Sequence, residues 1–184
     1  MPPPPIHPQR PRYALLDRDG TIVVEKNYLR SADDLEFLPN AIEGLNLLAA
    51  QWYQLIIITN QSGIARGLMT VEEVEAIHAE LTRRLYAQGV FIRGIYYCPH
   101  SPEADCECRK PRTGLVERAR AEHGFRLDQC LVIGDKTSDI ELGRNIGARR
   151  SILVRTGYGK QHEATAQADV VADDLLAAAR GLCR

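Results

Sequence analysis

The chain has 184 residues, of which 45% are hydrophobic and 26% charged, and its formal net charge is −1. This length suffices for one domain with its own hydrophobic core. The balanced charge argues against a nucleic-acid binder, which normally carries a basic surplus, and no apolar run approaches the roughly 18 residues of a membrane helix. We therefore expect a single domain over 13–184 that binds neither nucleic acid nor membrane.

The first twelve residues hold six of the ten prolines and lack the apolar segment of a secretory signal. A proline-rich segment of this kind has too little apolar content to form a packed core. We interpret 1–12 as a disordered tail.

Short apolar runs alternate with amphipathic stretches along the rest of the chain, a pattern typical of βαβ units around a parallel sheet. The predicted strands are 13–16, 55–58, 94–97, 130–133 and 151–154. The predicted helices are 41–51, 70–88, 113–123, 138–145 and 174–183. Asn40 is expected to cap the first helix, and Thr70 with Glu73 forms a capping box for the second. The predicted fold class is α/β, with a doubly wound, Rossmann-like parallel sheet.

Ligands of a doubly wound sheet bind at the carboxyl ends of the strands, near the point where the strand order reverses. The polar motifs of this chain stand at such strand ends. The segment 22–38 after the first strand has the size of a small hairpin flap, and no insert is long enough for a second domain.

Two carboxylates follow the first predicted strand, in the segment Leu16-Asp17-Arg18-Asp19-Gly20-Thr21. Alternate residues of an extended chain point to one side, so Asp17 and Asp19 repel unless a cation, most commonly Mg²⁺, neutralises them. The metal would screen Asp17 from a phosphate dianion, so that Asp17 can attack as nucleophile while Asp19 serves as acid and then base. An Asp-Gly turn after an edge strand is the alternative interpretation.

Polar loops also follow the second and third predicted strands. Thr59-Asn60-Gln61-Ser62-Gly63 offers a hydroxyl and backbone N–H groups that can bind phosphate, although a capped turn has a similar composition. Lys110 would meet the phosphate as a point charge, and Arg109 could grip another substrate oxygen. A basic pair is usually solvated surface, but this pair stands between a cysteine cluster and a helix start, which favours the binding role.

The fourth predicted strand ends in a third acidic segment, Gly134-Asp135-Lys136-Thr137-Ser138-Asp139. Asp135 would complete the Mg²⁺ shell together with Asp17 and the backbone carbonyl of Asp19. Asp139 either holds a metal-bound water or caps the following helix, and both interpretations stay open.

Three thiols and an imidazole fall within eleven residues, at Cys98, His100, Cys106 and Cys108. A Cys₃His set suits tetrahedral Zn²⁺, and because all four positions are filled the site should be structural. It would lock the loop that carries Arg109 and Lys110. The alternative is a reduced, metal-free loop, which would have little apolar content to order it. Such clustering also indicates a reducing cytoplasm rather than disulfides.

The remaining thiols and imidazoles have no such pattern. Cys130 and Cys183 occupy apolar positions and are expected in the core. We interpret His78, His123 and His162 as surface or helix residues, because they lack acidic or thiol neighbours at ligand spacing.

In this order, Asp17-x-Asp19-Gly-Thr, Thr59, Lys110 and Gly134-Asp135-x-x-x-Asp139 resemble the four motifs of the haloacid dehalogenase (HAD) superfamily of aspartyl phosphotransferases. The resemblance covers about 13–159 and implies a HAD-like fold, here with a small flap and a zinc loop and without a large cap domain. It implies that Asp17 is the nucleophile, Asp19 the general acid and base, and that Thr59 and Lys110 hold the phosphoryl group.

Within that superfamily the chain is most similar to the heptose bisphosphate phosphatases. The likeness is carried by Thr59-Asn-Gln-Ser-Gly-Ile-Ala-Arg-Gly67, Tyr96-Tyr-Cys-Pro-His100, Cys106-x-Cys-Arg-Lys-Pro111 and Val154-Arg-Thr-Gly157. It implies Mg²⁺-dependent removal of the 7-phosphate through an aspartyl-phosphate, and zinc on the four Cys and His residues. It also implies substrate contacts from Glu25, Lys26, Asn27, Tyr28, Thr59, Asn60, Gln61, Ser62, Arg109, Lys110 and Lys136. The product would feed lipopolysaccharide-core or nucleotide-heptose synthesis in a bacterial cytoplasm.

Two other functions are weighed against this one. Histidinol-phosphate phosphatases share the acidic motifs and a similar zinc loop, but Arg109, Lys26 and Arg66 outnumber Glu25 near the site and favour a second phosphate over an ammonium. A catalytically silent, zinc-stabilised binding protein is disfavoured because every residue that the chemistry requires is present. The expected partner is a small phosphorylated substrate, and the protein is expected to be a monomer.

Overall fold

The structure is a computed structural model that describes residues 11–182. The predicted proline-rich tail therefore lies outside the described residues except for its last two positions, and Cys183 lies outside them as well. The first strand begins at Arg12, one residue before the expected start.

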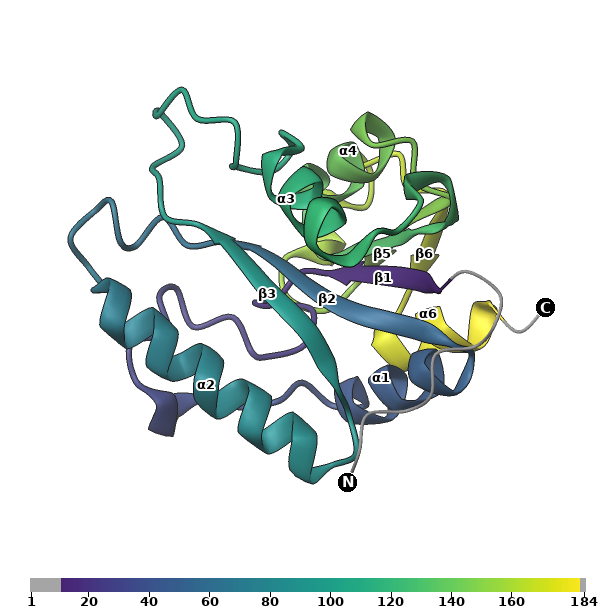
Figure 1. Ribbon diagram of the computed structural model, residues 1–184, viewed down its shortest axis with the longest axis horizontal. Coiled ribbons are helices and arrows are strands. Elements are labelled where there is room, and N and C mark those ends of the chain that lie inside the picture. The colour runs from purple at the N-terminus through teal and green to yellow at the C-terminus, as the bar shows by residue number, and fades with distance from the viewer. Residues whose placement is uncertain (1–10, 183–184) are drawn as a thin grey trace.

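Six strands form one parallel sheet in the order β3-β2-β1-β4-β5-β6 (Figure 1). Their bounds are β1 Arg12–Leu16, β2 Tyr53–Asn60, β3 Ile92–Cys98, β4 Leu131–Gly134, β5 Arg150–Val154 and β6 Val170–Ala172. The strand order reverses between β1 and β4, so the carboxyl ends of these two strands flank the position where doubly wound sheets bind their ligands.

Helices cover both faces of the sheet. The α-helices are α1 Ala41–Ala50, α2 Val71–Ala87, α3 Gly114–His123, α4 Thr137–Asn145, α5 Gly159–His162 and α6 Leu175–Gly181. Two 3₁₀ turns, η1 Ala32–Asp34 and η2 Leu127–Gln129, complete the regular structure of the described chain. Figure 1 shows α1, α2 and α6 on one side of the sheet, with α3 and α4 on the other.

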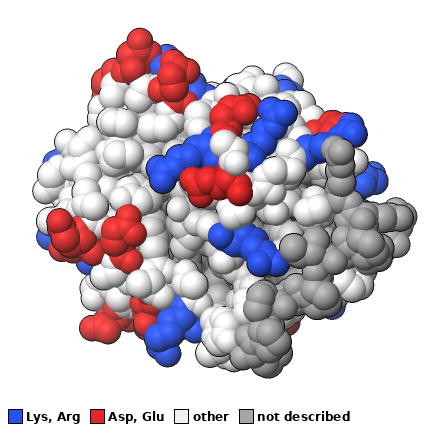
Figure 2. All heavy atoms as spheres, in the orientation of Figure 1, with Lys and Arg blue, Asp and Glu red and all other residues white. Residues whose placement is uncertain are grey.

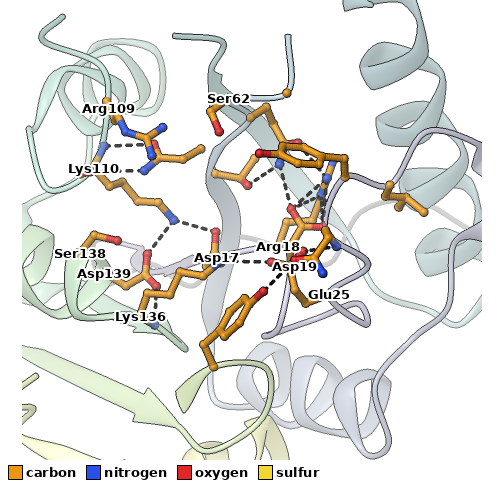
Figure 3. A pocket seen from close by; sticks show the side chains of 18 residues that line it. Asp17, Arg18, Asp19, Glu25, Ser62, Arg109, Lys110, Lys136, Ser138 and Asp139 are labelled. Carbon is orange, nitrogen blue, oxygen red and sulfur yellow. Dashed lines mark hydrogen bonds and ion pairs between the residues drawn. The ribbon is translucent and has the colours of Figure 1, made fainter. Parts of the chain in front are cut away.

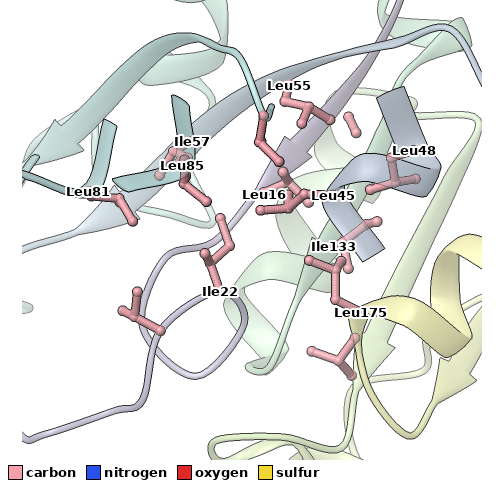
Figure 4. Close-up of a cluster of buried hydrophobic side chains, with 14 of the residues drawn as sticks. Leu16, Ile22, Leu45, Leu48, Leu55, Ile57, Leu81, Leu85, Ile133 and Leu175 are labelled. Atoms are coloured by element: carbon pink, nitrogen blue, oxygen red, sulfur yellow. The ribbon is translucent and has the colours of Figure 1, made fainter. Parts of the chain in front are cut away.

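Alternation along β1 and β2 explains the two cores. Leu16 and Ile57 face the larger cluster with α1, α2 and α6, where Leu45, Leu81 and Leu175 pack against them (Figure 4). The intervening side chains of the same strands point to the opposite face, in a second cluster with α3 and α4. Because the central strands are buried on both faces, they read in sequence as continuous apolar runs, as parallel strands do.

The α/β doubly wound prediction is confirmed, and each of the five predicted strands overlaps an observed one. The strand β6 and the helix α5 were not predicted; they have three and four residues, too few to leave a periodic pattern. The capping box of Thr70 and Glu73 is present. The predicted cap by Asn40 is wrong, because this residue is left-handed, at φ 62°, and its amide donates to Asp174 instead.

Acidic and basic side chains are interspersed on the face shown in Figure 2, in keeping with the net charge of −1. Among the described residues, no helix combines the length and the apolar character needed to span a membrane.

Candidate active site

A cavity of about 270 Å³ opens at the carboxyl ends of the central strands (Figure 3). Asp17 directly follows β1, and Thr59 is the penultimate residue of β2. Lys110 lies in the loop after β3. The backbone N–H of Asp17 donates to the carbonyl of Ile133 over 2.9 Å, which ties the end of β1 to β4. The parallel pairing of the strands thus brings polar residues that lie far apart in sequence to one edge of the sheet.

Lys110 joins two buried carboxylates. Its Nζ lies 2.7 Å from Oδ1 of Asp17 and 2.7 Å from Oδ1 of Asp139, and it donates to the carbonyl of Ile58 over 2.7 Å. Burial alone would raise the pKa of Asp17, but Lys110 and Lys136 hold that pKa below its ordinary value. Burial would likewise lower the pKa of Lys110, yet Asp139 and Asp17 hold it above its ordinary value. Asp17 is thus a carboxylate, and Lys110 an ammonium, at neutral pH.

Asp139 also caps the helix α4. Its Oδ2 accepts from the backbone N–H of Lys136 over 3.0 Å, which favours the capping interpretation over a metal-bound water. This contact, together with the ion pair to Lys110, uses both oxygens of the carboxylate. Asp139, which lines the cavity, therefore fixes the position of the Lys110 ammonium.

The donor set beside Asp17 fits a divalent cation. Buried oxygens of Asp17 and Asp135 lie within 4.8 Å of each other and of an oxygen of Asp139, which the contacts to Lys110 and Lys136 already use. Oδ2 of Asp135 accepts from the N–H of Tyr158 over 2.8 Å, but its buried Oδ1 has no hydrogen-bond partner among the described residues. Burial and the charge of Asp17 raise the pKa of Asp135 to about 8. A hard cation such as Mg²⁺ would satisfy the free oxygen and offset the repulsion.

Two glycines bring the backbone close to Asp135. Gly20 has φ +83° and Gly157 has φ +55°, a region that favours glycine. A Cβ atom on either residue would lie 2.2 Å from Oδ2 of Asp135. The carboxylate is therefore enclosed by main chain on two sides.

The carboxylate of Asp19 does not join the cluster of Asp17, Asp135 and Asp139. It is held instead by the guanidinium of Arg18 and by Nε2 of Gln61, which donates to Oδ2 over 2.8 Å. The same Nε2 donates to the hydroxyl of Thr59 over 2.9 Å. Gln61 thus connects the predicted acid and base with the predicted phosphate-binding hydroxyl.

Asn60 positions the backbone of Lys110. Its amide donates to the carbonyl of Lys110 over 3.3 Å and its Oδ1 accepts from the N–H of Lys110 over 3.1 Å. This reciprocal pair holds the loop after β3 against the end of β2. It explains how the ammonium of Lys110 reaches Asp17 across the cavity.

Most of the predicted substrate contacts surround the cavity. Those that line it are Glu25, Asn27, Tyr28, Thr59, Asn60, Gln61, Ser62, Arg109, Lys110 and Lys136. Lys26 does not line it; its Nζ lies 3.3 Å from Glu36. Glu25 pairs with Lys136 over 3.2 Å, and the carbonyl oxygen of the Asn27 side chain accepts from the hydroxyl of Tyr158 over 2.9 Å, so the flap is tied to the residues after β4 and β5.

The four predicted zinc ligands come together after β3. Cys106 Sγ lies 3.7 Å from the sulfur of Cys98 and 3.7 Å from that of Cys108, and the Cys98 and Cys108 sulfurs are 3.1 Å apart. His100 Nδ1 lies 3.2 Å from Cys108 Sγ. Sulfurs bound at about 2.3 Å to one tetrahedral Zn²⁺ would be about 3.7 Å apart. The chemistry and spacing of this donor set fit zinc.

Some residues of the site region were not singled out by sequence. Arg18, Ser138 and Tyr158 line the cavity. His78, expected on the surface or a helix, lies on α2 but is buried, and its Nε2 is 3.0 Å from Nη1 of Arg18. The position of Arg18 between Asp17 and Asp19 could have indicated from the sequence that it lies at the site. No neighbouring residue in the sequence indicates that His78 contacts Arg18.

A family model and several curated relatives match the chain. A family model described as HAD-hydrolase-like matches residues 107–178. The chain is 39% identical over 154 residues to the D-glycero-alpha-D-manno-heptose-1,7-bisphosphate 7-phosphatase of Photorhabdus laumondii, which covers 80% of this chain and 84% of the relative. It is 40% identical over 140 residues to the D-glycero-beta-D-manno-heptose-1,7-bisphosphate 7-phosphatase of Helicobacter pylori, covering 76% and 81%.

A solved structure is similar over nearly the whole chain. The D,D-heptose 1,7-bisphosphate phosphatase from B. bronchiseptica, complexed with magnesium and phosphate, superposes with a TM-score of 0.86 at 30% identity. The match covers 94% of this chain and 98% of that one. A second D,D-heptose 1,7-bisphosphate phosphatase, from Burkholderia thailandensis, has a TM-score of 0.71 at 28% identity over the same shares.

Proposed function

Because the chain belongs to the heptose 1,7-bisphosphate 7-phosphatase family of HAD hydrolases, we propose that it hydrolyses the 7-phosphate of D-glycero-D-manno-heptose 1,7-bisphosphate. The observation that carries the proposal is the buried Asp17 carboxylate with Lys110 at 2.7 Å, at the floor of a cavity lined by phosphate-binding groups. The products are heptose 1-phosphate and inorganic phosphate.

Asp17 acts as the nucleophile in this proposal. Its carboxylate forms a bond to the phosphorus of the 7-phosphate while the bond from phosphorus to the sugar oxygen breaks. Lys110 and the hydroxyl of Thr59 stabilise the negative charge that develops on the transferred group. Water then attacks the phosphorus of the aspartyl-phosphate, which releases phosphate and restores Asp17.

Asp19 moves the protons of both steps. It gives a proton to the departing sugar oxygen and later takes a proton from the attacking water. The Asp19 carboxylate lines the cavity beside Gln61, which also contacts Thr59. The acid and the phosphate-binding hydroxyl are thus linked by one side chain.

The metals are assigned by the donor chemistry. Asp17 and Asp135 would hold Mg²⁺ with the backbone carbonyl of Asp19, and the bound cation supplies positive charge next to the phosphoryl oxygens. The magnesium in the B. bronchiseptica relative supports this choice. Cys98, His100, Cys106 and Cys108 would hold a structural Zn²⁺.

The charge of the cavity rim favours a sugar bisphosphate over histidinol phosphate. Arg109 and Lys136 line the cavity, and Glu25, the acidic residue nearby, is paired with Lys136. Two cations that were counted from the sequence do not line the cavity: Lys26 pairs with Glu36, and Arg66 donates to the hydroxyl of Tyr28. Since Lys136 and Glu25 offset each other, a second phosphate would meet the cation of Arg109, whereas the ammonium of histidinol would meet an acid that is already neutralised.

The setting of the reaction follows from the substrate. Heptose 1-phosphate is consumed in nucleotide-heptose and lipopolysaccharide-core synthesis, so the protein would work in a bacterial cytoplasm. We further propose that it acts as a monomer. Size-exclusion chromatography with light scattering measures this state directly.

Phosphate release by the purified protein with Mg²⁺ tests the proposed function. Both anomers of heptose 1,7-bisphosphate and histidinol phosphate are compared at matched concentrations, with Asp17→Asn as the inactive control. A higher kcat/KM for a heptose anomer is expected. Preference for histidinol phosphate would reject the proposed substrate, and turnover by Asp17→Asn would reject the nucleophile.

A further inference from the structure

Arg18 is a large, charged side chain with only 1% of its surface exposed. Taking a guanidinium out of water is costly unless protein acceptors bond to its N–H groups. Neither attack at phosphorus nor phosphate binding, as described above, uses this cation. Its role must therefore lie with the groups that it contacts.

The guanidinium of Arg18 grips the carboxylate of Asp19. Nε lies 3.0 Å from Oδ2 and 3.1 Å from Oδ1, and Nη2 lies 3.0 Å from Oδ1 (Figure 3). Nη2 also donates to Oε1 of Gln61 over 3.0 Å. Arg18 and Gln61 thus hold one carboxylate from two sides, and 14% of the Asp19 side chain stays exposed to the cavity.

His78 holds the other end of the guanidinium. Its Nε2 lies 3.0 Å from Nη1 of Arg18, and because arginine can only donate, this nitrogen must accept. Burial and the charge of Arg18 lower the pKa of His78 to about 3, which keeps the ring neutral. The ring of Tyr97 packs edge-on at 5.3 Å and restricts the imidazole.

We propose that Arg18 and His78 are positioning residues, in which His78 orients the guanidinium and the guanidinium orients the Asp19 carboxylate toward the leaving oxygen. This inference deepens the proposed function and rests on it. His78 does not line the cavity among the described residues, so it acts through Arg18.

The chemical consequence is confined to proton transfer. As the bond from Asp17 to phosphorus forms and the bond to the leaving oxygen breaks, Asp19 delivers its proton to that oxygen, which requires heavy atoms about 2.6–3.2 Å apart. Without the acceptor on His78, Nη1 would turn toward another acceptor and carry the Asp19 carboxylate with it. Leaving groups that depart as stable anions need no proton and would tolerate this change.

Two aryl phosphates separate positioning from simple loss of structure. Phenyl phosphate has a poor leaving group and p-nitrophenyl phosphate a good one, and kcat/KM reports the steps up to the departure of that group. We expect His78→Leu to lower kcat/KM about tenfold more for phenyl phosphate than for p-nitrophenyl phosphate, a part of the range for general acid catalysis. His78→Gln keeps an acceptor near the position of Nε2. It should restore the wild-type ratio of kcat/KM for phenyl phosphate to kcat/KM for p-nitrophenyl phosphate.

Ile77→Val is the matched control, because it removes one buried methylene from the same helix, at a residue of the larger apolar cluster. It should leave the ratio unchanged. Equal losses for both substrates in His78→Leu, or no loss, would overturn the inference. If His78→Leu does not fold, Arg18→Lys keeps the charge without the planar fork and should show the same selective loss.

Failure of the proposed function has a different signature. A wild-type protein that hydrolyses the aryl phosphates but not heptose 1,7-bisphosphate would overturn the proposed substrate. The ratio of kcat/KM for the two aryl phosphates would still test the positioning role of Arg18 and His78. A wild-type protein that hydrolyses no phosphate monoester would overturn both.

Discussion

The ammonium of Lys110 lies 2.7 Å from Oδ1 of Asp17, and both groups are almost fully buried. The same ammonium neutralises Asp139, so one cation serves two carboxylates. Charges of this kind are retained only when each has a partner, which makes the site sensitive to loss of any one of them.

Lys110→Met should therefore damage both catalysis and stability. We expect kcat to fall at least about a hundredfold, because charge on the transferred phosphoryl group loses its stabilising cation. The free energy of unfolding should fall by about 3–5 kcal/mol, because Asp17 and Asp139 are left unpaired. Steady-state kinetics and urea unfolding measure the two effects. Lys160→Met, in the short helix α5, is the control, and an active Lys110→Met protein would contradict the role of Lys110.

Arg109→Gln tests the rim of the cavity. We expect KM for heptose 1,7-bisphosphate to rise about tenfold to a hundredfold, as for a lost hydrogen bond to a charged group, with a smaller change in kcat. Arg126→Gln removes an arginine that pairs with Asp128 outside the cavity and should leave KM unchanged. An equal rise of KM in both variants would point to overall charge instead of a contact by Arg109.

The cysteine cluster predicts one zinc per chain, measured by elemental analysis of the purified protein. Cys106→Ser should lose the metal and lower Tm by roughly 5 °C or more, since about 1 kcal/mol shifts Tm by about 2–4 °C at this size. A strong chelator should have the same effect on the wild type. Cys130→Ala changes a buried thiol outside the cluster and should keep the zinc; full zinc content in Cys106→Ser would reject the assignment.

Burial of neutral His78 predicts that acid destabilises the fold. The pKa of His78 is lowered to about 3 from its ordinary 6.5, so the unfolded chain binds a proton that the folded chain does not as pH falls below 6.5. This stability is fully present above pH 6.5 and is lost progressively toward pH 3. Between pH 8 and pH 5 the loss through His78 should be about 2 kcal/mol.

Urea unfolding of His78→Gln isolates this effect. Because glutamine does not titrate, the variant should lose about 2 kcal/mol less than the wild type between pH 8 and pH 5. The other histidines and the carboxylates are common to both proteins and cancel in the difference. Parallel pH profiles of the two proteins would show that His78 binds its proton equally well in the folded state.

Motifs at strand ends were predictable because their side chains are placed by local rules. The apolar runs of β1 and β2, and the polar residues where those runs stop, mark Asp17 and Thr59 in the sequence. The parallel sheet then brings them to one edge, as expected. Cys98 and Cys108 are close in sequence, so their clustering needed no tertiary information.

Contacts between distant elements were not predictable. His78 meets Arg18 across 60 positions, and a histidine on an amphipathic helix has the same local pattern whether it is buried or exposed. The direction of a flap side chain likewise depends on contacts with residues outside its immediate sequence. Lys26 pairs with Glu36, whereas its neighbour Glu25 lines the cavity. Asn40 adopts a left-handed conformation, and its side chain then reaches Asp174 and not the helix start.

The enclosure of Asp135 by Gly20 and Gly157 distinguishes the floor of the cavity from its rim. A Cβ atom at either glycine would collide with Asp135 Oδ2, so we expect a substitution there to displace this carboxylate. The rim is built by side chains of loops, among them Tyr28 and Arg109. We therefore expect substitutions in these loops to change substrate preference while the floor of the cavity stays the same.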